Sequence, residues 1–160
     1  MSTSTRDVSL TQVYRVYIRA TPEQVWDAIT RPEWTERYFY GSRADYELRP
    51  GGAYRGFCVV DGREQDLVDG EVLEADPPRR LVQTWRVLYD PALTGEGFTR
   101  LTWELQGGES GVTALTVVHE MEDAPGVARN VGGDAGGWSW VLSGLKTLLE
   151  TGTPLPAVGG

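Results

Sequence analysis

The chain has 160 residues, the size of one ordinary domain, and is acidic: 15 Lys and Arg against 23 Asp and Glu give a net charge of −8 at pH 7. A chain of this length buries a core without covalent staples, and its negative field repels phosphate backbones and anionic lipid surfaces, so we expect no nucleic-acid partner. Cys58 is the only cysteine and His119 the only histidine, which excludes an internal disulfide, a thiolate metal cluster and a multi-histidine metal site. We therefore expect no metal and no cofactor.

The N-terminal residues contain no basic region followed by an apolar run, and no window approaches the roughly 18 apolar residues of a membrane span. A single cysteine is typical of a reducing compartment. We expect a soluble, cytoplasmic protein without a membrane span.

Residues 12–18 alternate between two faces and predict a strand. A strong helix start follows, because Thr21 is a capping residue, the next residue is a proline suited to a first turn, and Gln24 completes a capping box. Pro32 ends this helix and can itself open a second short helix that runs to Tyr38. The sequence thus predicts two short helices after the first strand.

Turn-forming residues then separate six further runs of two-residue alternation, which predicts antiparallel hairpins. A longer loop is expected at 89–97. The six predicted strands are 42–48, 53–60, 65–75, 80–88, 98–106 and 112–120.

The last predicted element is a long helix over 136–152 with a single apolar face. A lone amphipathic helix after a run of antiparallel strands best buries its apolar face by lying across one face of their sheet. The space between helix and sheet can be packed core or a ligand pocket. The predicted class is α+β. The apolar face comprises Trp138, Val141, Leu142, Leu145, Leu148 and Leu149.

Five motifs in this order resemble the START-like superfamily, also called SRPBCC, and within it the family similar to the C-terminal domain of the activator of the heat-shock protein 90 ATPase. They are ATPEQVWDAIT followed by RPEWTERYF, the turn at Pro50, GEVLEADPPRRLVQTW, LTVVHEM, and the Gly-Trp pair before WVLSGLKTLLETG. The resemblance covers about residues 12–151. It implies a helix-grip fold, in which a curved seven-stranded antiparallel sheet wraps around the long C-terminal helix and leaves a cavity between them.

The resemblance leaves several functions open, because START-like proteins include lipid carriers, hormone receptors, cyclases and a co-chaperone module. The family's chaperone activators carry a separate N-terminal chaperone-binding domain, for which we expect no room here. We expect residues 1–11 and 152–160 to form a flexible N-terminus and a flexible tail around one START-like domain at 12–151.

Two polar residues share strand faces with apolar neighbours: Gln83 among Leu81, Trp85 and Val87, and His119 beyond Val117. A buried polar group needs a partner, and a ligand in a cavity can supply one. Each residue can equally be a satisfied structural group. His119 is also the one weak candidate for a catalytic base, since a base needs an orienting partner.

Aromatic side chains are placed where the helix pair, the sheet and the long helix converge. Their rings suit a pocket wall that packs on one side and offers an N–H or O–H on the other, and plain core is the alternative. The predicted ligand-binding residues are Trp34, Tyr38, Gln83, Trp85, Trp103, His119, Trp138, Val141 and Leu142.

Trp140 lies opposite Trp138 on the helical wheel, so the sheet should not bury both; a homodimer contact is one explanation. The segment before the helix is rich in glycine, which has a low helix propensity, so its conformation is only weakly determined by the sequence. We expect 123–137 to act as a flap over the cavity.

Three functions stay open at this point. The first is non-enzymatic binding of a small hydrophobic or aromatic molecule between sheet and helix. The second is a cyclase, dehydratase or hydrolase that uses His119. The third is a protein-binding, co-chaperone-like module.

Overall fold

The computed structural model describes residues 10–132 and 137–156. Its seven strands form one sheet in the order β1-β7-β6-β5-β4-β3-β2, and every neighbouring pair is antiparallel. The strands are β1 (Thr11–Ile18), β2 (Arg43–Tyr46), β3 (Ala53–Val60), β4 (Arg63–Asp76), β5 (Arg80–Val87), β6 (Thr99–Gly107) and β7 (Thr113–Glu120). The helices are α1 (Pro22–Thr30), α2 (Pro32–Thr35), α3 (Pro91–Thr94), α4 (Pro125–Val131) and α5 (Gly137–Thr151).

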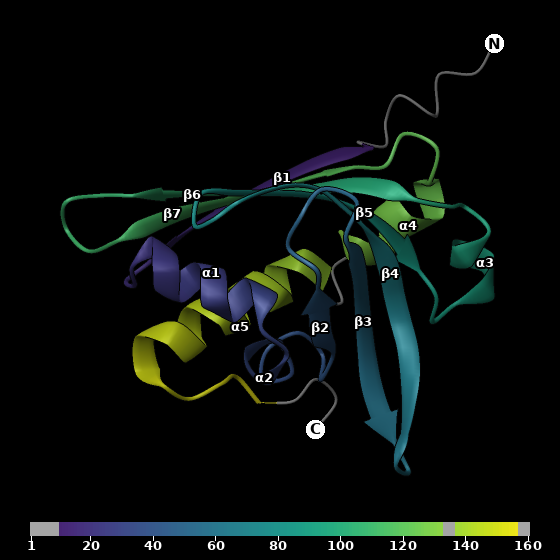
Figure 1. Cartoon of the computed structure of the whole chain (residues 1–160), viewed down its shortest axis with the longest axis horizontal. Coiled ribbons are helices and arrows are strands. Elements are labelled where there is room, and N and C mark those ends of the chain that lie inside the picture. The colour runs from purple at the N-terminus through teal and green to yellow at the C-terminus, as the bar shows by residue number, and fades with distance from the viewer. Residues whose placement is uncertain (1–9, 133–136, 157–160) are drawn as a thin grey trace.

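The sheet curves around α5 (Figure 1). Strands β1, β7 and β6 lie along one side of the helix, while β3 and β4 turn away from them and extend past its end. Helices α1 and α2 lie beside α5, and α3 and α4 lie near the other end of the sheet. The predicted α+β helix-grip fold, with two short helices after the first strand, is confirmed.

The capping box predicted for α1 is present. The Thr21 hydroxyl accepts the Gln24 N–H at 3.2 Å, and the Gln24 side chain accepts the Thr21 N–H at 2.9 Å. Two N–H groups that the first turn leaves without helical partners are thereby satisfied. This fixes the point at which the chain leaves β1 and turns beside α5.

Helix α5 buries the predicted apolar face. Trp138, Val141, Leu142, Leu145 and Leu148 are buried, and Leu149 is half-buried against the same core. The helix ends where Gly152 takes a left-handed φ of +81° and its N–H bonds the Leu148 carbonyl at 2.8 Å, a cap that glycine adopts without strain.

The backbones of β4 and β5 approach each other closely at Gly70. A Cβ at this position would lie 2.0 Å from the Thr84 carbonyl oxygen, so only glycine fits. A glycine inside a strand commonly marks such a close backbone approach.

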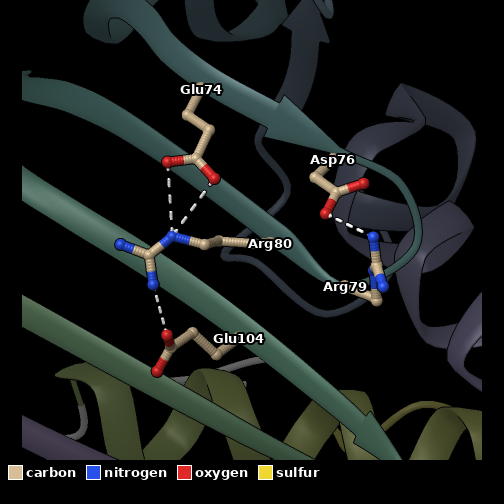
Figure 2. A network of polar contacts seen from close by, with 5 residues as sticks. All are labelled: Glu74, Asp76, Arg79, Arg80 and Glu104. Carbon is tan, nitrogen blue, oxygen red and sulfur yellow. Dashed lines mark hydrogen bonds and ion pairs between the residues drawn. The ribbon is translucent and has the colours of Figure 1, made fainter.

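The solvent face of the sheet carries ion pairs across the strands (Figure 2). Arg80 of β5 contacts Glu74 of β4 at 3.3 Å and Glu104 of β6, and Arg79 contacts Asp76 at 2.9 Å. All five side chains are well exposed, so each pair contributes only about 0–1 kcal/mol. These ion pairs lie on the outer face of the sheet.

Two short helices depart from the prediction. Helix α3 occupies part of the predicted 89–97 loop, and α4 occupies part of the predicted 123–137 flap. Elements of four and seven residues carry too little periodicity to be predicted from sequence. Residues 133–136 of that segment lie outside the described residues, as do 1–9 and 157–160 of the predicted flexible ends.

Candidate ligand pocket

A pocket of about 460 Å³ opens between the N-terminal half of α5, helix α4 and strands β4 and β5. Aromatic and aliphatic side chains form most of its wall. They are Phe39, Leu67, Val68, Trp85, Trp138 and Val141. This volume lies within the usual range of small-molecule pockets.

A β-bulge places two consecutive residues of β4 in this wall. Gly56 of β3 pairs with Val68 and Phe57 with Asp66, so Leu67 is an extra residue in β4. In a regular strand neighbouring side chains point to opposite faces, whereas a bulge re-aims one of them. Leu67 and Val68 consequently both line the pocket.

Tyr40, Tyr89 and Asn130 line the pocket where it meets solvent. The two tyrosines are 49% and 46% exposed, and the Tyr89 hydroxyl donates to the Asn130 side-chain oxygen. Burial, with Asp90 and Tyr40 nearby, raises the pKa of Tyr89, so this phenol stays protonated and able to donate at neutral pH.

Tyr40 has a left-handed φ of +53°, a conformation that costs energy for a residue other than glycine.

Helix α4 forms one side of the pocket and is held in place by side chains from elsewhere. The Glu96 carboxylate accepts the N–H groups of Gly126 at 3.0 Å and Val127 at 2.9 Å. In the middle of the helix, the Gln12 amide donates to the Ala128 carbonyl at 2.9 Å. These bonds tie α4 to the segment after α3 and to β1.

Trp138 lies at the centre of an aromatic cluster behind the pocket. Its ring packs edge to face against Phe39, Trp103 and His119, at centroid separations of 5.7, 5.4 and 5.9 Å, and lies tilted 6.4 Å from Trp85. Such edge contacts stabilise aromatic pairs beyond the area they bury. The start of α5 is therefore anchored to β5, β6 and β7.

His119 is fully buried and both of its ring nitrogens are engaged. Nδ1 accepts the Trp138 indole N–H at 3.1 Å, and Nε2 lies 2.7 Å from the Thr99 hydroxyl. Thr99 donates its own proton to the Trp85 carbonyl at 2.8 Å. An indole nitrogen only donates, so Nδ1 must be the acceptor and Nε2 must carry the proton.

This arrangement suits a structural histidine. Burial lowers the pKa of His119 from 6.5 to about 3, so the ring stays neutral at physiological pH. A group with so low a pKa and no free nitrogen is poorly placed to take a proton from a substrate.

Gln83 is also fully buried, and its oxygen is doubly occupied. Oε1 accepts the Trp103 indole N–H at 3.1 Å and the Tyr46 hydroxyl at 2.7 Å. Because the indole can only donate, the amide orientation is determined. Its Nε2 has no hydrogen-bond partner among the described residues.

Of the nine residues predicted from sequence to bind ligand, Trp85, Trp138 and Val141 line the pocket and six do not. Leu142 and Tyr38 lie in the core, where the Tyr38 hydroxyl donates to the Ala28 carbonyl at 2.7 Å. Trp34 is half-buried against the core, with the Arg37 guanidinium 5.6 Å from its ring centre. The others outside the wall are Gln83, Trp103 and His119.

Sequence reasoning did not find the remaining lining residues. Leu67 enters the wall only through the bulge, and Asn130 only because α4 folds over the sheet. The one available signal was the turn after Tyr89, which marks a chain reversal at a sheet end, where pockets commonly lie.

Trp140 is half-buried and lines a second hollow of about 490 Å³. Tyr38, Gly144 and Leu155 line the same hollow. Part of the surface around this tryptophan thus belongs to the chain's own C-terminal segment. A dimer contact at Trp140 stays a prediction.

Residues 19–150 match the family described as "Activator of Hsp90 ATPase homolog 1-like protein". The chain belongs to this family. The expected membership is confirmed by a match over most of the chain. No curated protein matches the sequence. Within the described residues, no helix is long and apolar enough to cross a membrane, and no group of three His, Cys, Asp or Glu side chains is arranged to hold a metal ion.

Solved structures share the fold. A protein from Rhodobacter sphaeroides is 27% identical, with 88% of this chain and 92% of that chain covered and a TM-score of 0.67. CalU16 from Micromonospora echinospora is 23% identical, with 89% and 77% covered and a TM-score of 0.66. DynU16, a protein in the dynemicin biosynthetic locus, is 22% identical, with 91% and 49% covered and a TM-score of 0.63.

Proposed function

We propose that this family member binds a small apolar or aromatic molecule in the pocket between α5, α4 and strands β4 and β5. The observation that carries the proposal is a 460 Å³ hollow with a predominantly aromatic and aliphatic wall. Each Å² of apolar surface that a ligand removes from water favours binding by roughly 25 cal/mol.

The absence of acid–base machinery in the described wall favours binding over catalysis. Ser42, Tyr40, Tyr89 and Asn130 supply its polar side chains, and none of them is a nucleophile paired with a general base. His119, the candidate base, lies behind the wall with both nitrogens engaged. The proposed role is that of a carrier or sensor of its ligand.

The test is a direct titration with 1-aminoanthracene, a small aromatic probe whose emission rises in apolar sites. Leu67→Trp extends a half-buried side chain into the hollow, whereas Leu73→Trp places the same ring at an exposed position on the same strand. We expect saturable binding that weakens about tenfold or more in Leu67→Trp and stays within about twofold in Leu73→Trp.

Equal affinities in the two variants, or no saturable binding by the wild type, would overturn the proposal. Native mass spectrometry of freshly purified protein, with Leu67→Trp as the matched control, extends the test to molecules acquired in the cell.

A further inference from the structure

Two buried N–H donors have no hydrogen-bond partner among the described residues: Trp85 Nε1 and Gln83 Nε2. Both side chains are on the same face of β5, two residues apart. An unpartnered buried donor costs about 1–3 kcal/mol, and native proteins leave few of them. Trp85 is also part of the pocket wall, so an oxygen brought in by a ligand is a candidate partner.

Hydroxyl groups gather beside Trp85 at the pocket. Ser42 lines the pocket, and a Cβ at Gly56 would lie 2.9 Å from the Ser42 oxygen and 3.4 Å from the Tyr54 oxygen. Burial raises the pKa of Tyr54, and the nearby Trp85 indole offsets part of that rise, although the two groups do not meet in hydrogen-bond geometry. Glycine at 56 thus lets two hydroxyl groups converge on one region, which we call the polar floor: Ser42, Tyr54 and the Trp85 N–H.

The polar floor offers donors without positive charge. No Arg or Lys side chain belongs to the described wall of the pocket. A carboxylate there would lose its hydration without gaining an ion pair, which costs several kcal/mol. A neutral oxygen acceptor loses far less and gains the Trp85 N–H.

We propose that the ligand is an uncharged aromatic compound whose carbonyl oxygen accepts the Trp85 indole N–H at the polar floor, with its rings against Trp138, Val141 and Leu67. This deepens the proposed function and rests on it. The indole nitrogen is covered in this structure, so the ligand oxygen reaches it when a neighbouring side chain moves aside. Fatty acids and pure hydrocarbons are the disfavoured classes.

Three probes of one skeleton separate these classes: 9-fluorenone, fluorene and fluorene-9-carboxylate. By calorimetry we expect 9-fluorenone to bind wild-type protein at least about fivefold more tightly than fluorene, and the carboxylate to bind most weakly. In Trp85→Phe, which keeps an aromatic wall but lacks the N–H, we expect the preference for 9-fluorenone to vanish. Trp140→Phe, outside this pocket, should retain it.

Nuclear magnetic resonance of the indole N–H groups gives a second readout that needs no variant to fold well. We expect 9-fluorenone, and not fluorene, to move the Trp85 indole proton downfield, as a new hydrogen bond does. Binding of fluorene and 9-fluorenone with equal affinity and without that shift would overturn the inference and leave the proposed function standing. If fluorene-9-carboxylate bound most tightly of the three probes, the inference that the ligand is uncharged would be wrong. Binding of none of the three would count against the proposed function itself.

Discussion

The indole N–H of Trp138, at the start of α5, donates to Nδ1 of His119, near the end of β7, across 3.1 Å. This bond joins α5 to the sheet at the edge of the ligand pocket. It also determines the proton position on the chain's only histidine, because an indole cannot accept.

The tautomer of His119 is the first testable consequence. We expect a neutral ring with the proton on Nε2 from pH 8 down to pH 5, since burial lowers the pKa to about 3. Long-range ¹H–¹⁵N spectra of the imidazole measure both the tautomer and the titration. In Trp138→Phe, Nδ1 loses its donor while the ring stays buried, so we expect the pKa to rise and yet remain below 6.5. A wild-type midpoint near 6.5 would contradict this account.

Stability should depend on pH through the same group. The folded-state pKa lies below the unfolded value of 6.5, so the unfolded chain takes up a proton first as pH falls. The contribution of His119 is therefore fully present above pH 6.5 and is lost towards pH 3, at about 1.4 kcal/mol per pH unit.

Urea unfolding of wild type and His119→Gln isolates this contribution, because the carboxylates are common to both proteins. We expect the wild type to be more stable than the variant at pH 7.5 and the difference to shrink by about 2 kcal/mol at pH 5.0. A difference that is constant with pH would show that His119 titrates alike in both states.

The close approach of β4 and β5 should depend on Gly70. In Gly70→Ala the new Cβ would lie 2.0 Å from the Thr84 carbonyl oxygen, so the β4–β5 pair must separate, and we expect a loss of about 2–3 kcal/mol. Gly95→Ala is the matched control, because its φ of −65° suits alanine and its nearest neighbour would be 3.7 Å away. That change should be neutral or stabilise by up to about 1 kcal/mol. Equal unfolding free energies for the two variants would refute the close approach.

Glu96 should govern the local stability of α4. In Glu96→Ala the N–H groups of Gly126 and Val127 lose their acceptor, and we expect their hydrogen exchange to accelerate about tenfold or more. Amides of β6 and β7 should exchange as before. Glu109→Ala, an exposed change in the segment after β6, serves as control. Unchanged exchange at Gly126 would exclude this support of the pocket wall.

Local patterns predicted much of the architecture. The capping box at Thr21, the apolar face of α5 and the two-residue alternation of the strands are short-range signals, since each depends on residues that are neighbours in sequence. The buried positions of Gln83 and His119 followed from the same alternation. Helices α3 and α4 did not, for two different reasons. Helix α3 is capped locally by Asp90 but is too short to show a period. Helix α4 has no side-chain cap of its own and is tied by the distant residues Glu96 and Gln12.

The sequence by itself determined the α+β class, the capping box at Thr21 and the apolar face that α5 turns to the sheet, because these patterns lie in consecutive residues. The family and the helix-grip fold came from the resemblance of five motifs to the START-like superfamily. Only the tertiary structure decided the place of the pocket and the role of His119. The bulge at Leu67, the close approach at Gly70 and the bond from Trp138 each depend on a partner in another element of the fold. Whether a converging surface becomes core or pocket depends on how those distant side chains fill the space between them.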